Sequence, residues 1–111
     1  MPYDEDLDSR AFSMVSKWPG VTAKKMFGGV CYLLDGNMVG GVYKDYLIVR
    51  LGEELQKKAL LKRFVKPFDI TGRAMKGWIM VEPKGYEGPQ LKRWLEQARA
   101  FVNTLPKKAR R

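Results

Sequence analysis

Residues 30–51, VCYLLDGNMVGGVYKDYLIVRL, decide the fold of this chain. Their aliphatic and aromatic runs predict three strands, at 30–34, 38–43 and 46–51. The first connection is Asp35-Gly36-Asn37, in which glycine and asparagine tolerate the positive φ of a hairpin turn, and the second is Lys44-Asp45. Because connections of this length join antiparallel neighbours, the stretch predicts an antiparallel meander.

The flanking sequence adds strands and helices to this meander. A strand at 21–27 precedes it, with Gly28-Gly29 as a bend or bulge between the two. Apolar residues at helical spacing predict three helices, at 4–18, 53–64 and 89–105. A short strand is expected at 68–70 and a clear one at 77–82. The order α-β-β-β-β-α-(β)-β-α predicts the α+β class, with helices flanking an antiparallel meander sheet.

The predicted strands carry apolar residues on both faces of the sheet. In 46–51, Leu47, Val49 and Leu51 alternate with Tyr46, Ile48 and Arg50, so both faces carry apolar residues. A sheet that is apolar on both sides needs helices on both faces or a partner subunit. We therefore expect self-association, most simply as a homodimer.

The composition indicates one globular domain that lacks the residues of many common catalytic sites. The 111 residues have a mass of 12.8 kDa and are 45% hydrophobic, without the run of roughly 18 apolar residues that a membrane helix needs. The N-terminus is acidic and resembles no signal peptide. A single cysteine, Cys31, excludes an internal disulfide, and we expect its thiol to be buried. Both observations lead us to expect a cytoplasmic protein. The absence of histidine excludes histidine-based catalysis and zinc sites. We expect no enzyme activity, no metal and no cofactor.

Positive charge is distributed unevenly along the sequence. The net charge is +9, from 21 Lys and Arg against 12 Asp and Glu. Seven bases and one acid lie between Lys57 and Lys76, and a single domain at 1–106 is followed by a basic tail at 107–111. Such a segment is either a solvated face or a surface that attracts polyanions. The candidate nucleic-acid contacts are Lys57, Lys58, Lys62, Arg63, Lys66, Lys107, Lys108, Arg110 and Arg111.

Arg50 is an unusual residue because it interrupts an apolar strand. A buried guanidinium must find acceptors, so we expect a carboxylate or main-chain carbonyls to hold it, with Asp69 as a candidate partner. The alternative is recognition of an anionic ligand, to which the guanidinium fork is suited. Arg73 and Lys76 in the loop at 71–77 pose the same choice between a plain loop and an anion site.

The stretch KKMFGGVCYLLDGNMVGGVYKDYLIVRLG, followed by RFVKPFDITGRAMKGWIMVEP, resembles the TfoX N-terminal domain family, the competence-regulator (TfoX/Sxy) domain of bacteria. The residues that carry the likeness and could form a ligand or partner site are Met26, Phe27, Gly28, Gly29, Gly36, Asn37, Arg50, Asp69, Gly72, Arg73, Met75, Lys76 and Gly77. The resemblance implies a fold like that of secretion chaperones, with frequent dimers. It also implies promotion of competence-gene transcription together with a cyclic-AMP-responsive activator, with no catalytic residues. The likeness covers the N-terminal half of the two-domain regulators.

Three functions remain open from the sequence. The favoured one is a regulatory or protein-interaction domain that acts on transcription. The alternatives are a non-specific nucleic-acid-binding accessory protein, which the basic segment favours, and a binder of small anionic ligands.

Overall fold

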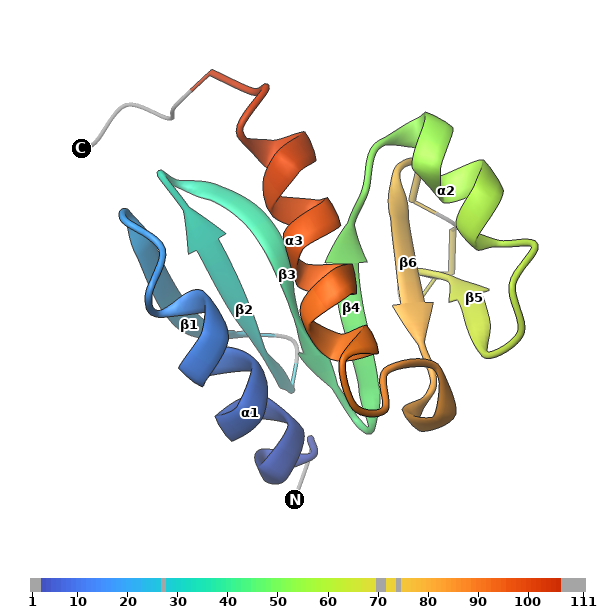
Figure 1. The fold of residues 1–111 in the computed structure, drawn as a ribbon, viewed down its shortest axis with the longest axis horizontal. Helices are drawn as coiled ribbons and strands as arrows, with labels where there is room; N and C mark the ends of the chain where they lie inside the picture. The colour runs from blue at the N-terminus through green and yellow to red at the C-terminus, as the bar shows by residue number, and fades with distance from the viewer. Residues whose placement is uncertain (1–2, 27, 70–71, 74, 107–111) are drawn as a thin grey trace.

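The computed structural model describes residues 3–26, 28–69, 72–73 and 75–106, and there the fold is an open six-stranded antiparallel sheet with three helices (Figure 1). The strands are β1 (Val21–Met26), β2 (Gly29–Leu34), β3 (Asn37–Tyr43), β4 (Tyr46–Arg50), β5 (Val65–Pro67) and β6 (Trp78–Val81). The helices are α1 (Glu5–Val15), α2 (Glu53–Ala59) and α3 (Gln90–Val102), and a 3₁₀ turn spans Pro83–Gly85. The strand order is β1-β2-β3-β4-β6-β5, so β1 and β5 are the edges. The predicted α+β class and order of elements are confirmed.

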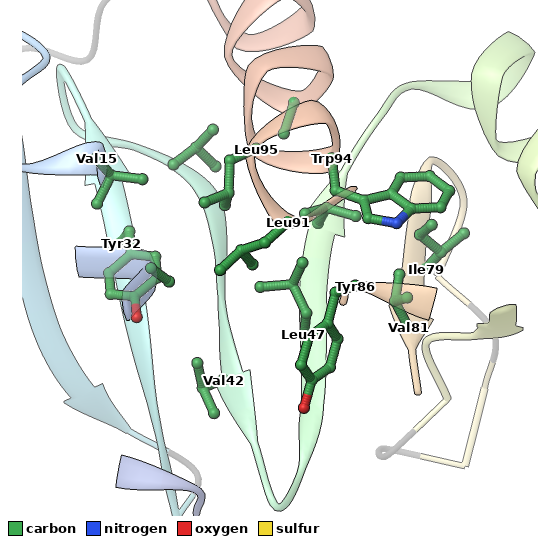
Figure 2. Packing of buried hydrophobic residues seen from close by; sticks show 14 of the residues in the cluster. Val15, Tyr32, Val42, Leu47, Ile79, Val81, Tyr86, Leu91, Trp94 and Leu95 are labelled. Atoms are coloured by element: carbon green, nitrogen blue, oxygen red, sulfur yellow. The ribbon is translucent and has the colours of Figure 1, made fainter. Parts of the chain in front are cut away.

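The main core lies between the sheet and the helices, all three of which contribute to it. The apolar stripe of α3 predicted from the sequence is buried, with Leu91 and Leu95 fully enclosed and Trp94 beside them (Figure 2). It packs against Leu47 of β4 and Ile79 of β6, whose side chains point to the same side of the sheet (Figure 2). The helices α1 and α3 run side by side over this face (Figure 1).

A second, smaller core cluster lies on the opposite face of the sheet. It consists of Ile48, Trp78 and Met80 from the strands, together with Phe68 from the segment after β5. The rings of Phe68 and Trp78 have their centroids 5.6 Å apart. The expectation that both faces are apolar is thus confirmed, but the described helices cover one face only, and Phe68 covers part of the other.

Two predicted boundaries are wrong in the region between α2 and β6. The helix predicted at 53–64 ends at Ala59, because the chain turns at Phe64 with a φ of 68° and Val65 then pairs with Val81. The short strand predicted at 68–70 is therefore β5 at Val65–Pro67, and Phe68 leaves the sheet to cover the second cluster. Ile70 lies outside the described residues. A proline is tolerated in β5 because this strand is an edge.

Two buried tyrosines predict a loss of stability at alkaline pH. The Tyr32 hydroxyl donates to Asp8 Oδ1 at 2.5 Å, and the Tyr86 hydroxyl donates to the Asp45 carbonyl at 2.7 Å. Burial raises the pKa of both phenols, that of Tyr86 to about 12. In the unfolded chain both titrate near the ordinary value of about 10, so the unfolded state releases protons first and stability falls as pH rises above about 10. Urea midpoints measured from pH ~8 to ~11 should decline, and the decline should be shallower for Tyr86→Phe; an unchanged slope in that variant would contradict the assignment.

Candidate functional site

Arg50 lies at the end of β4 and is held by a carbonyl and two aromatic rings. Its Nη1 donates to the main-chain oxygen of Met38 at 3.3 Å. The guanidinium carbon lies 5.5 Å from the ring centroid of Trp78 and 5.9 Å from that of Phe101. The prediction that a main-chain carbonyl holds Arg50 is confirmed. The prediction of Asp69 as its partner is wrong, because Asp69 is exposed and no ion pair joins it to Arg50 in the described part of the chain.

This arrangement predicts that the packing of the Arg50 stem matters more than its charge. Arg50→Ala removes the stem as well as the charge and should lower the free energy of unfolding by about 1–2 kcal/mol, within the ordinary range for a single substitution. Arg50→Met keeps apolar packing on Trp78 and should cost less than half as much. Urea denaturation of both variants measures the difference. Equal and negligible effects would place Arg50 in solvent.

The loop before β6 is fastened to α2 by the Gln56 side chain and to the residues after β4 by the Gly77 carbonyl. The Gln56 side-chain oxygen accepts from the Gly77 amide at 2.9 Å, and its Nε2 donates to the carbonyls of Met75 and Trp78 at 3.2 and 3.1 Å. The Gly77 carbonyl in turn accepts from the amides of Leu51 and Gly52 at 2.7 and 3.1 Å. Sequence reasoning missed Gln56, because nothing in its neighbourhood along the chain distinguishes it from a solvated helix residue.

The structure brings part of the family motif together at one end of the sheet. Asn37 is buried at the start of β3, and its Nδ2 donates to the Pro106 carbonyl after α3 at 2.9 Å. Arg50 and Gly77 lie at this same end, as the pairing of β3, β4 and β6 requires. Gly36 is in the adjoining hairpin turn, and the other motif residues of the loop are exposed: Asp69, Gly72, Arg73, Met75 and Lys76.

The Met26–Gly29 part of the motif lies elsewhere. Met26 ends β1 and pairs with Gly29 at the opposite end of β2 from the hairpin that contains Gly36. Gly28, between them, has a φ of 74° and forms the turn that the sequence predicted as a bend. Phe27 lies outside the described residues. The motif residues therefore mark two separate ends of the sheet.

The predicted basic surface is divided by the fold. Lys57 and Lys58 are exposed on the last turn of α2. Lys62 and Arg63 follow in the turn after that helix, whereas Lys66 lies on the other side of the sheet and pairs with Glu82 at 3.7 Å. The hydrogen bond of Lys66 with Tyr46 raises the pKa of its ammonium group. The tail residues Lys107, Lys108, Arg110 and Arg111 lie outside the described residues.

The helix-free face is the surface made by Met38, Tyr43, Tyr46, Ile48, Phe68, Trp78 and Met80. Its outer side chains, Met38, Tyr43 and Tyr46, are half-buried, and the inner four are buried. Lysine ammonium groups lie over the outer rings: Lys44 is 5.5 Å from the Tyr43 centroid, and Lys66 is 5.5 Å from that of Tyr46. The face is thus an aromatic surface with cations at its rim.

Cys31 lies on the same side of the sheet, opposite Gly41 of β3. It is buried, which confirms the expected buried thiol, and burial raises the pKa of that thiol. In the described residues no cluster of three or more Cys, Asp or Glu side chains is placed to hold a metal ion.

The geometry is that of an α+β domain with one face covered by helices and one aromatic face left without them. The family model described as TfoX N-terminal domain matches residues 13–102, which is most of the chain. The chain belongs to this family. Comparisons with curated proteins and with solved structures gave no match. Within the described ranges, none of the helices has the length and apolar character needed to cross a membrane.

Proposed function

We propose that this domain is a non-enzymatic regulatory module of the bacterial cytoplasm that binds another protein through its helix-free face. Membership of the TfoX N-terminal domain family supports a regulatory role. We propose, more specifically, that this role is in the transcription of competence genes. The observation that carries the binding surface is the set of half-buried Met38, Tyr43 and Tyr46 around a buried aromatic cluster. Aromatic residues and methionine are enriched at protein interfaces.

Charge complementarity favours, as the partner, an apolar protein surface bordered by carboxylates. Arg50, Lys44 and Lys66 lie over aromatic rings of the helix-free face. Of these three, only Lys66 has a carboxylate partner in the described part of the chain, Glu82. Acidic groups on a partner would pair with the remaining cations while its apolar centre covers the tyrosines.

Affinity capture from native cytoplasm tests this proposal with two matched variants. Tyr43→Asp places a carboxylate on the helix-free face, and Leu61→Asp makes the same charge change at a side chain that is 88% exposed elsewhere. A protein that survives nuclease treatment, stays bound to Leu61→Asp and is lost from Tyr43→Asp supports the proposal. Its affinity in purified form should fall with added salt, because salt screens the charge pairs. Equal capture by both variants contradicts the proposal.

A second copy of the chain is the other occupant that the sequence favours, and the homodimer stays a proposal. Two copies with a formal charge of +9 each repel, so self-association should strengthen with added salt, opposite to binding of an acidic partner. Sedimentation at high micromolar concentration tests it. A species larger than 12.8 kDa that disappears in Tyr43→Asp supports the dimer, and a single 12.8 kDa species contradicts it.

A further inference from the structure

A basic pocket of about 290 Å³ lies on the surface beside Trp94, away from the residues of the helix-free face. Three segments form it: the turn after α2, the 3₁₀ turn Pro83–Gly85 and the first half of α3. Its lining contains four cationic side chains, Lys62, Arg63, Lys84 and Arg93. Lys62 and Arg63 belong to the basic segment at 57–66, whereas Lys84 and Arg93 are distant from it in sequence. The fold therefore brings two further cations to the two that the basic segment supplies.

No carboxylate lines this pocket among the described residues, and two acids on the neighbouring elements, Glu82 and Glu96, have partners outside it. Glu82 pairs with Lys66, and Glu96 pairs with Lys92 at 3.9 Å. The four lining cations make no ion pair with any described residue. Their charges are therefore uncompensated within the part of the chain that the structure describes. A concave site lined by positive charge concentrates a positive electrostatic potential, which attracts anions.

The floor of the pocket is fixed in position. Trp94 is buried, and its Nε1 donates to the Gly85 carbonyl at 2.8 Å. The Lys62 ammonium lies 5.3 Å from the centroid of the same ring, so its position is set by a buried residue. Gln90 and Gln97 add side-chain amides that can donate to an oxyanion.

We infer that this pocket binds a small molecule carrying one or more phosphate groups, a function separate from protein binding at the helix-free face. Two guanidinium groups supply the planar donor pairs that match phosphate oxygens, and two lysines supply point charges. Four positive charges suit a ligand with several negative charges, such as a diphosphate. The volume is at the lower end of ligand sites, which run from about 300 to 1,000 Å³, and this favours a small ligand.

Calorimetric titration with inorganic pyrophosphate tests the site in two double variants of equal charge. Lys84→Gln with Arg93→Gln removes two cations from the pocket, and Lys57→Gln with Lys58→Gln removes two from α2 outside it. Both lower the formal charge from +9 to +7, and all four residues are exposed, so both variants should fold. The pocket variant should weaken the Kd by about tenfold or more, and the α2 variant by about twofold or less.

A short DNA duplex in a second titration separates a small phosphate ligand from the phosphate backbone of nucleic acid. Saturable pyrophosphate binding that is lost in the pocket variant alone supports the inference. Equal loss in both variants, or no saturable binding up to about 10 mM, overturns it. Duplex binding without pyrophosphate binding also overturns it, and points to the sequence-independent nucleic-acid alternative. Tyr43→Asp should bind pyrophosphate normally, so this result is independent of the proposed protein interaction.

Discussion

Trp94→Ala should lower the free energy of unfolding by about 3–5 kcal/mol, the usual range for truncating a buried tryptophan. Trp94 is 6% exposed and belongs to the buried stripe of α3, next to Leu91 and Leu95 (Figure 2). Its removal opens a cavity against the sheet and leaves the Gly85 carbonyl without the indole donor. Since small domains have a total stability of about 5–15 kcal/mol, this one change brings the protein close to unfolding at ambient temperature.

Urea denaturation followed by far-ultraviolet circular dichroism measures this loss. Leu61→Ala is the control, because that leucine is 88% exposed and should change stability by less than about 0.5 kcal/mol. Trp94→Phe keeps most of the apolar volume and should fall between the two. A loss below about 1 kcal/mol for Trp94→Ala would show that α3 is peripheral to the core.

Gly41→Ala should cost about 2–3 kcal/mol, because β2 leaves no room for a side chain there. A Cβ at Gly41 would overlap the Val30 carbonyl oxygen and lie 3.1 Å from the Cys31 Cα. Both obstacles are backbone of an interior strand, so they can move only if the pairing of β2 with β3 is distorted. The loss therefore comes from main-chain displacement rather than from a lost contact.

Gly72→Ala provides the matched control for this glycine substitution. Gly72 has a φ of 89° and no atom within 4 Å of the added Cβ, so it reports backbone strain alone, about 1 kcal/mol. Denaturant midpoints for the two variants should therefore differ clearly, with Gly41→Ala the less stable. If both cost the same, β2 and β3 are not packed as closely as the structure has them.

The elements set by local pattern were predictable from the sequence. The hairpin turn and the alternation of Leu47 and Val49 with Ile48 follow from turn chemistry and from the two-residue period of a strand. The positive φ angles of that turn fall on Asp35 and Gly36, however, and not on Asn37, which is the first residue of β3. The stripe of α3 follows from helical spacing, and its burial agrees. Even Arg50 was identified as anomalous by its type alone, because a guanidinium in an apolar strand must find acceptors.

What the sequence did not predict depends on contacts between distant segments. β5 is a strand because Val65 pairs with Val81, and nothing in the three residues Val65–Pro67 has the pattern of a strand. The Gln56 contacts join α2 to a loop about twenty residues away. The place of Lys84 and Arg93 in the pocket was not predictable either. They lie outside the basic segment, and an isolated lysine or arginine in a sequence does not indicate which residues it will lie beside in the fold.

The two edges of the sheet also limit how this protein can assemble. β5 is three residues long and contains Pro67, which has no amide hydrogen to offer a neighbouring strand. β1 presents Lys24 and Lys25, both exposed, and charged lysines discourage a second sheet from aligning along an edge. The sheet therefore resists extension strand by strand, and a concentrated solution of the folded domain should remain clear rather than form fibrils.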